Sequence, residues 1–203
     1  MTYSVADYCY SMLEKTDDAK LRTLLVDLLN YGAASQDYTG YKHINTCNKA
    51  LTEEQKAWGT ATVPSVSSVL NTKVAVVEGA TAKWKGAGLV LDNAVTVRLR
   101  FAAESTEGLS VKITAAGQEW TITEFEPAGI EGEYYVRFSG LTARQMRETL
   151  NATIYCDGAA ISNTVAYSIE SYAAAKQNDA NAKLVTLLVA MMRYGDSAAA
   201  FLN

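Results

Sequence analysis

The two ends of the chain carry the same helical pattern of hydrophobic positions. Hydrophobic residues recur there at i, i+3, i+4 and i+7, the spacing that places side chains on one face of a helix. They are Leu21, Leu24, Leu25 and Leu28 near the N-terminus, and Leu184, Leu187, Leu188 and Met191 near the C-terminus. The pattern predicts one amphipathic helix at each end.

These stripes belong to an internal repeat, in which residues 3–38 align with residues 167–201 after a one-residue gap. Each copy predicts a helical hairpin, with Ser4 or Ser168 as the N-cap of its first helix. In the first copy, Asp17 and Asp18 interrupt the hydrophobic pattern and are the predicted caps of the second helix. One hairpin cannot bury such a stripe alone, so we expect the hairpins to pack together or each against the central region. Identical pairs include Tyr3/Tyr167, Ser4/Ser168, Tyr8/Tyr172, Lys20/Lys183, Leu21/Leu184, Thr23/Thr186, Leu24/Leu187, Leu25/Leu188, Val26/Val189, Tyr31/Tyr194 and Gly32/Gly195.

Repeated tyrosines and glycines within the two copies predict packing rather than ligand binding. Tyr8/Tyr172 and Tyr31/Tyr194 recur at the same places in both hairpins, as residues between helices do. Gly32 and Gly195 lie near the ends of the stripes, where a helix stops or allows a neighbour to approach closely.

The centre of the chain changes to an alternation of apolar and polar residues typical of half-buried strands. The alternating runs are 95–101, 109–113 and 134–138, and Asp157-Gly158 predicts a tight hairpin turn. The alternation places Tyr134 inside with Val136 and Phe138. Two T-x-x-Q boxes predict short helices at 52–58 and 142–148.

About seven short strands at this spacing favour two stacked antiparallel sheets. The predicted fold is α+β: an Ig-like antiparallel β-sandwich with repeated helical hairpins at both ends, packing as a helical bundle. Its predicted domains are 1–60, a hairpin plus connector that is the tail of a preceding repeat unit; 61–166, the β-sandwich; and 167–203, the second hairpin. The chain thus reads as one full unit preceded by the tail of another.

Charge and hydropathy narrow the classes of partner. The chain has 203 residues, a net charge of −4 and a pI of about 5.1, which argues against nucleic acid, because binding to phosphates requires a basic surface. It contains no run of about 18 apolar residues, so we expect no membrane insertion. The N-terminus lacks the pattern of a signal peptide, which leaves a cytoplasmic protein or a piece of a longer secreted one.

Residue types that carry catalysis are sparse. His43 is the single histidine, and Cys9, Cys47 and Cys156 lack the spacing of zinc ligands, so we expect no metal and no cofactor. We interpret the cysteines as small buried hydrophobic residues. A disulfide between two of them is the alternative. The carboxylate pairs Glu53/Glu54, Glu124/Glu126 and Glu131/Glu133 fit solvated turns and helix starts, so we expect no enzyme.

Aromatic residues provide the best candidates for ligand binding. Trp84, Trp120 and Tyr135 could form a stacking platform for a sugar or a protein partner, next to Arg137. The competing interpretation is that both tryptophans fill the core of the sandwich. Alternation places Tyr135 and Arg137 on the outer face, where Arg98, Arg100 and Lys112 would complete a basic strip or a plain solvated surface.

Five segments of the chain resemble a module found near the C-termini of large secreted proteins of gut Firmicutes. They read YSVADYCYSML, LLNYGAASQDY, ALTEEQKAWGT, FSGLTARQMRETLNATIY and VTLLVAMMRYGDSAAAF. The resemblance covers nearly the whole chain. It implies a bacterial source, an extracellular or cell-surface setting as a fragment of a longer protein, and no catalytic residues. An anaerobic habitat would also suit reduced cysteines.

Together these observations predict a non-catalytic extracellular module that serves attachment, adhesion or spacing. The alternatives are a carbohydrate-binding module, motivated by the aromatic residues, and a module that binds a host protein such as immunoglobulin or mucin through its helices. Its partner would be a cell-surface protein or glycan, of the host or of the bacterium itself. The sequence leaves the ligand, the oligomeric state and the anchoring mode open.

Overall fold

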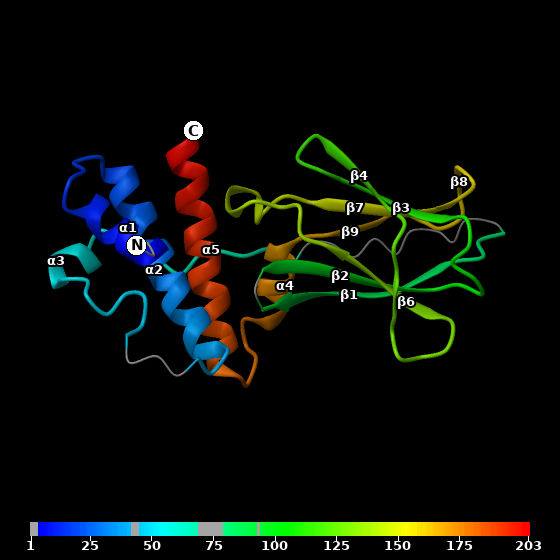
Figure 1. The fold of residues 1–203 in the computed structure, drawn as a ribbon, viewed down its shortest axis with the longest axis horizontal. Helices are drawn as coiled ribbons and strands as arrows, with labels where there is room; N and C mark the ends of the chain where they lie inside the picture. The colour runs from blue at the N-terminus through cyan, green and yellow to red at the C-terminus, as the bar shows by residue number, and fades with distance from the viewer. Residues whose placement is uncertain (1–3, 42–44, 69–78, 93) are drawn as a thin grey trace. The chain divides into compact units, whose positions relative to one another are not determined.

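The fold is α+β, with two antiparallel sheets and a set of helices (Figure 1). The structure, a computed structural model, describes residues 4–41, 45–68, 79–92 and 94–203. Tyr3 of the repeat and His43 therefore lie outside the described residues. The chain divides into two compact units. The helical unit comprises Met1–Ser67, Thr142–Met146 and Ala173–Asn203; the strand unit comprises Ser68–Leu141 and Arg147–Tyr172.

The first repeat copy forms helices α1 (Val5–Leu13) and α2 (Ala19–Tyr38). The predicted N-caps are confirmed. Ser4 Oγ accepts a hydrogen bond from the Asp7 backbone N–H at 3.1 Å. Asp18 Oδ1 accepts bonds from the Lys20 and Leu21 backbone N–H groups at 2.8 and 3.1 Å. These side chains satisfy backbone donors that have no partner within the helix.

The second copy forms α4 (Ile169–Lys176) and α5 (Ala182–Leu202). Ser168 Oγ accepts from the Ser171 backbone N–H at 2.9 Å, as predicted for the repeated cap. Asn181 caps α5 at the position where the first copy uses Asp18. Both copies therefore fold by the same local rules although their sequences differ.

The longer helices of the two copies pack against each other in the helical unit. Tyr31 of α2 stacks on Tyr194 of α5, with ring centroids 5.7 Å apart. Lys183 Nζ lies 2.8 Å from Asp37 Oδ1, so the start of α5 meets the end of α2 and the helices run antiparallel. The predicted packing role of Tyr31 and Tyr194 is confirmed, whereas that of Tyr8 is wrong, because Tyr8 is 52% exposed.

Two equivalent glycines let other segments approach these helices. A Cβ on Gly32 would lie 2.9 Å from Cys47 Sγ, and one on Gly195 would lie 3.1 Å from the Ala143 carbonyl oxygen. The helices continue past both glycines to Tyr38 and Leu202. Of the two predicted roles, close approach is therefore confirmed and helix termination is wrong.

The strand unit contains two antiparallel sheets. The first has the order β1-β2-β6-β5, with β1 Lys83–Leu91, β2 Val95–Ala102, β6 Glu133–Phe138 and β5 Glu126–Pro127. The second has the order β4-β3-β7-β8, with β4 Gln118–Ile122, β3 Leu109–Ala115, β7 Leu150–Cys156 and β8 Ala159–Ala160. Strand β9 (Val165–Tyr167) also pairs with β7.

The predicted alternation fixes which face of each sheet is buried. Val136 and Phe138 are buried, Tyr134 contacts the Phe101 ring, and Arg137 is exposed, as expected. Strands β2, β3 and β7 alternate in the same way, with Leu99, Val111, Ile154 and their inward-facing neighbours buried. The rings of Trp120 in one sheet and Phe138 in the other lie 4.8 Å apart, so the two sheets are in contact.

Three differences from the predicted elements have local causes. Strand β1 was not predicted, because Gly86 and Gly88 lower its strand propensity; pairing with β2 forms it nonetheless. The helix expected at 142–148 is a 3₁₀ turn over Ala143–Gln145, and the one expected at 52–58 is α3 (Glu53–Lys56). In both segments the capping box begins a single helical turn, but it does not by itself continue the helix over the further residues that were expected.

Helix α5 is, by length and composition only, apolar enough to cross a membrane. Core helices pass the same test, and 44% of its 18-residue window is buried inside the protein. It also carries Lys183, Arg193 and Asp196. The absence of membrane insertion stays a prediction.

Candidate functional site

The four predicted site residues do not form one site. Trp84 and Trp120 are half-buried and pack on inward-facing rings, whereas Tyr135 and Arg137 lie on the outer face of the first sheet. The pleat places successive side chains of a strand on opposite faces, so an inward-packed tryptophan and an outward-facing Tyr135 do not share a surface.

The Trp84 side chain is held both by its ring and by its indole N–H group. Its ring meets Phe101 edge-on, with centroids 6.0 Å apart. Its Nε1–H donates a hydrogen bond to the Asn163 carbonyl oxygen at 2.9 Å. A sugar would therefore compete with contacts that the indole already makes.

Trp120 is packed in a similar way. Its ring meets Phe138 at 4.8 Å, and a Cβ on Gly140 would lie 2.7 Å from the Phe138 ring and 3.4 Å from Trp120 Cε2. Phe101, whose ring Trp84 meets, and Val97, which pairs with Phe138, are four residues apart along β2. At about 3.3 Å per residue the two tryptophans are separated by roughly 13 Å along the strand, so they do not make a common platform.

The outer face of the first sheet carries a compact cluster of polar and aromatic side chains. We define the outer-face cluster as Arg98, Glu126, Tyr135 and Arg137. The Arg98 guanidinium lies over the Tyr135 ring, 4.4 Å from its centroid. Arg137 Nε donates to Glu126 Oε2 at 2.7 Å. A cation over a ring and an ion pair hold these side chains in place.

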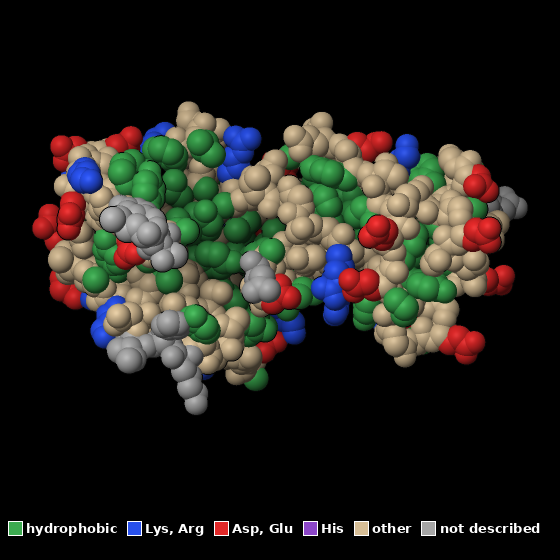
Figure 2. Space-filling view, in the orientation of Figure 1, with side chains coloured by type: hydrophobic (Ala, Val, Ile, Leu, Met, Phe, Trp, Pro, Cys, Tyr) green, Lys and Arg blue, Asp and Glu red, His purple; other side chains and the backbone are tan. Residues whose placement is uncertain are grey.

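Three members of the predicted basic strip, Arg98, Arg100 and Arg137, share the outer face of the first sheet, whereas the prediction is wrong for Lys112. Lys112 belongs to the second sheet, where it lies 3.6 Å from Glu119 and 5.1 Å from the Tyr155 ring centroid. Arg100 Nη1 lies 3.2 Å from Glu133 Oε2, an ion pair without hydrogen-bond geometry. Of the four basic side chains, Arg100, Lys112 and Arg137 therefore each lie beside a glutamate. In Figure 2 acidic and basic side chains stand close together over the strands.

The candidate catalytic groups are dispersed. Glu53, Glu54, Glu124, Glu126 and Glu131 are exposed, and Glu133 pairs with Arg100. Within the described part of the chain, no three His, Cys, Asp or Glu residues gather as they would around a metal ion. The predicted solvated setting is therefore confirmed for five of the six carboxylates and wrong for Glu133, whose side chain is 14% exposed with Oε2 buried.

The three cysteines are free thiols in the structure. Burial, and secondarily the neighbouring Cys47, raises the pKa of Cys9; burial also raises the pKa of Cys47. A raised pKa reduces the thiolate fraction at neutral pH and with it the reactivity of both groups. Cys9 behaves here as a small buried hydrophobe, while the disulfide alternative stays open.

An apolar cavity of about 310 Å³ lies in the helical unit, on the second repeat copy. Sequence reasoning missed it. The available signal was a set of differences between the copies, in which Leu13, Arg22 and Asp27 become Gln177, Val185 and Ala190. The lining residues are Val63, Pro64, Val66, Ala173, Gln177, Asn178, Val185, Leu188, Val189 and Met192.

Comparison of the chain with protein-family models, with curated proteins and with solved structures finds no match.

Proposed function

We propose that this chain is a non-catalytic module of a larger secreted or cell-surface bacterial protein, serving attachment, adhesion or spacing. The observation that carries the proposal is the pairing of the two repeat copies through α2 and α5, with Tyr31 stacked on Tyr194. The chain leaves the helical unit after Ser67, passes through it again at Thr142–Met146 and returns to it at Ala173. Tension between the two ends of the chain would therefore load the α2–α5 contact, which suits a load-bearing spacer.

We also propose that the strand unit is an Ig-like sandwich and that α1, α2 and α5 form a small helical bundle. The support for the sandwich is strand order. The sheets β1-β2-β6-β5 and β4-β3-β7-β9 follow the A-B-E-D and C′-C-F-G orders of immunoglobulin domains. Many cell-surface proteins use this architecture, so the analogy favours an extracellular setting.

A retention assay tests the function. The purified chain is immobilised and exposed to mucin glycans and serum proteins, and its hydrolytic activity on peptides and oligosaccharides is measured in parallel. A specific partner supports attachment or adhesion, and no partner favours a plain spacer. Turnover of any substrate by the pure chain would overturn the non-catalytic assignment.

A binding role for the outer-face cluster is the second candidate. Arg98 covers one face of the Tyr135 ring, and Arg137 stands beside it on the same strand. Guanidinium groups match carboxylates in shape and charge, so an acidic glycan or an acidic protein surface fits better than a neutral sugar.

The double variant Tyr135→Ala/Arg137→Ala, compared with Lys112→Ala/Tyr155→Ala on the other sheet, separates this candidate from the spacer. Loss of a retained partner in the first variant alone would place binding on the outer-face cluster. Retention of that partner by both variants would exclude the cluster and point to the helices.

A further inference from the structure

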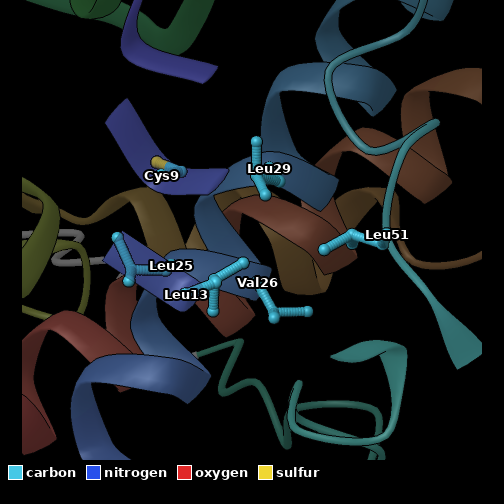
Figure 3. Close-up of a cluster of buried hydrophobic side chains, with 6 residues drawn as sticks. All are labelled: Cys9, Leu13, Leu25, Val26, Leu29 and Leu51. Atoms are coloured by element: carbon cyan, nitrogen blue, oxygen red, sulfur yellow. The ribbon is translucent and has the colours of Figure 1, made fainter. Parts of the chain in front are cut away.

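The two repeat copies differ in what covers the groove between their helices. In the first copy a connector residue, Leu51, points into that groove (Figure 3). It completes a cluster in which every side chain is 5% exposed or less. The cluster consists of Cys9, Leu13, Leu25, Val26, Leu29 and Leu51.

Residues 51–60, the covering segment, are fastened to α2 by specific contacts. Thr23 Oγ1 donates a hydrogen bond to the Trp58 carbonyl oxygen at 2.8 Å. The Arg22 guanidinium lies 4.5 Å from the centroid of the Trp58 ring. Gly59 fits closely against Val26, because a Cβ there would lie 2.8 Å from Val26 Cγ1.

The last residue of the covering segment is held by a buried carboxylate. Asp27 is 1% exposed, and its two oxygens accept hydrogen bonds from the Thr60 N–H at 3.0 Å and the Thr60 hydroxyl at 2.7 Å. The first groove is therefore closed by apolar, aromatic and charged contacts together.

The equivalent groove of the second copy is open. By the repeat alignment, Cys9, Leu13, Arg22, Leu25, Val26 and Leu29 correspond to Ala173, Gln177, Val185, Leu188, Val189 and Met192. All six of these line the 310 Å³ cavity. Val189 is half-buried where Val26 is fully buried, and Thr186 is exposed where Thr23 reaches Trp58.

A short segment forms the opposite wall of this cavity. Val63, Pro64 and Val66 line it, and Arg193 holds the preceding residues by donating to the Thr62 and Ala61 carbonyl oxygens, both at 3.1 Å. Both walls are thus fixed, while Val63 remains 70% exposed. In Figure 2 hydrophobic side chains also gather over α5.

We propose that this groove, lined by Ala173, Gln177, Val185, Leu188, Val189 and Met192, binds a peptide segment of another protein that resembles the covering segment. Such a segment carries a leucine followed by a short helical turn and Trp-Gly, as in L-T-x-x-Q-x-x-W-G-T. The repeat itself indicates the occupant, since the same helix positions bind Leu51–Thr60 in the first copy. The inference is independent of the extracellular function proposed above.

Substitutions between the copies set the preference of the open groove. Val185 replaces Arg22 and Ala190 replaces Asp27, so neither the cation nor the carboxylate of the first groove is present. A bound tryptophan would meet apolar surface instead of a guanidinium. At the peptide position equivalent to Thr60, a hydroxyl would find no carboxylate to donate to. We therefore expect a peptide with an apolar residue at that position to bind more tightly than one with threonine.

The test uses the full chain and a fluorescent synthetic peptide with the sequence of Leu51–Thr60. We expect saturable binding by anisotropy, weakened by about tenfold or more when Val189 is changed to Lys. Leu202→Lys, on the same helix and outside the cavity lining, should bind normally. A peptide with alanine in place of Trp58 should bind at least about tenfold more weakly.

A second measurement avoids variants that fold poorly. A photo-crosslinking group at the leucine of the peptide should label residues 173–192 of the unmodified chain. Labelling of residues 9–29 instead would mean that the peptide displaces the native covering segment, and would overturn the proposal. So would the absence of binding, or a dimer of the chain that Val189→Lys abolishes and the peptide leaves intact, since the occupant would then be a second copy.

Discussion

Tyr31 and Tyr194 stack with their ring centroids 5.7 Å apart and their planes inclined by 11°. They are the same position of the two repeat copies. A residue meets its own equivalent only close to a two-fold axis, so the antiparallel α2–α5 pair has local two-fold symmetry. An internal duplication thus packs against itself within one chain.

Loss of either ring should destabilise the helical unit. We expect Tyr31→Ala or Tyr194→Ala to lower the free energy of unfolding by about 1–3 kcal/mol, because a half-buried aromatic contact is lost. Urea denaturation measures this. Tyr8→Ala, at a position 52% exposed, is the control and should change stability by less than about 0.5 kcal/mol. Equal effects at Tyr8 and Tyr31 would contradict the assignment.

The same pair should make stability depend on pH in the alkaline range. Burial raises the pKa of Tyr31 and of Tyr194; secondarily, Tyr194 raises that of Tyr31 and Cys9 that of Tyr194. The unfolded chain then loses these protons at lower pH than the folded chain. The stabilisation that the two protonated tyrosines contribute is fully present below the unfolded tyrosine pKa of about 10, and it is lost as the pH rises above that value.

Denaturant unfolding at pH values from about 8 to about 11, on either side of the unfolded tyrosine pKa, measures the slope, that is, how steeply the free energy of unfolding changes with pH. Tyr31→Phe/Tyr194→Phe should flatten it relative to the unmodified chain. Burial also raises the pKa of Tyr10 and Tyr167, so part of the slope should remain. An unchanged slope in the double variant would exclude the stacked pair as its source.

Asp27 should be a major anchor of the covering segment. It is buried, and it accepts two hydrogen bonds from Thr60. We expect Asp27→Ala to cost about 2–3 kcal/mol in unfolding free energy, because bonds to a charged acceptor are lost and the Thr60 donors lose their partner. Proteolysis should also cut the connector faster.

Asp37→Ala is the matched control for this change. Asp37 pairs with Lys183 on the surface, where both side chains are more than half exposed. An exposed ion pair contributes less than about 1 kcal/mol. If Asp37→Ala proved as costly as Asp27→Ala, burial would not be what makes Asp27 important.

Gly140 should be required for the contact between the two sheets. An added Cβ would lie 2.7 Å from two atoms of the rigid Phe138 ring, so Gly140→Ala must displace Phe138 or Trp120. We expect a loss of about 1–3 kcal/mol and a change in tryptophan fluorescence. Gly86→Ala, with no atom within 4 Å of the added Cβ, should leave both nearly unchanged.

The sequence alone determined the local structure of this chain. The caps at Ser4, Asp18 and Ser168, the alternation of β2, β3 and β6, and the equivalence of Tyr31 and Tyr194 all followed from residue type and spacing. The caps and the alternation depend on backbone geometry within a single element, where neighbours in sequence are neighbours in space. The equivalence of the two tyrosines follows from the alignment of the two repeat copies.

Only the tertiary structure decided which surfaces are covered. The helical stripe did not predict that Asp27 and Val26 would be buried, because the segment that covers them begins more than twenty residues later, at Leu51. Nor did alternation reveal that Trp84 and Trp120 meet different inward-facing rings, or that Lys112 is on the other sheet. Contacts between elements far apart in sequence depend on how whole faces pack together, and residue spacing within one element carries no record of that packing.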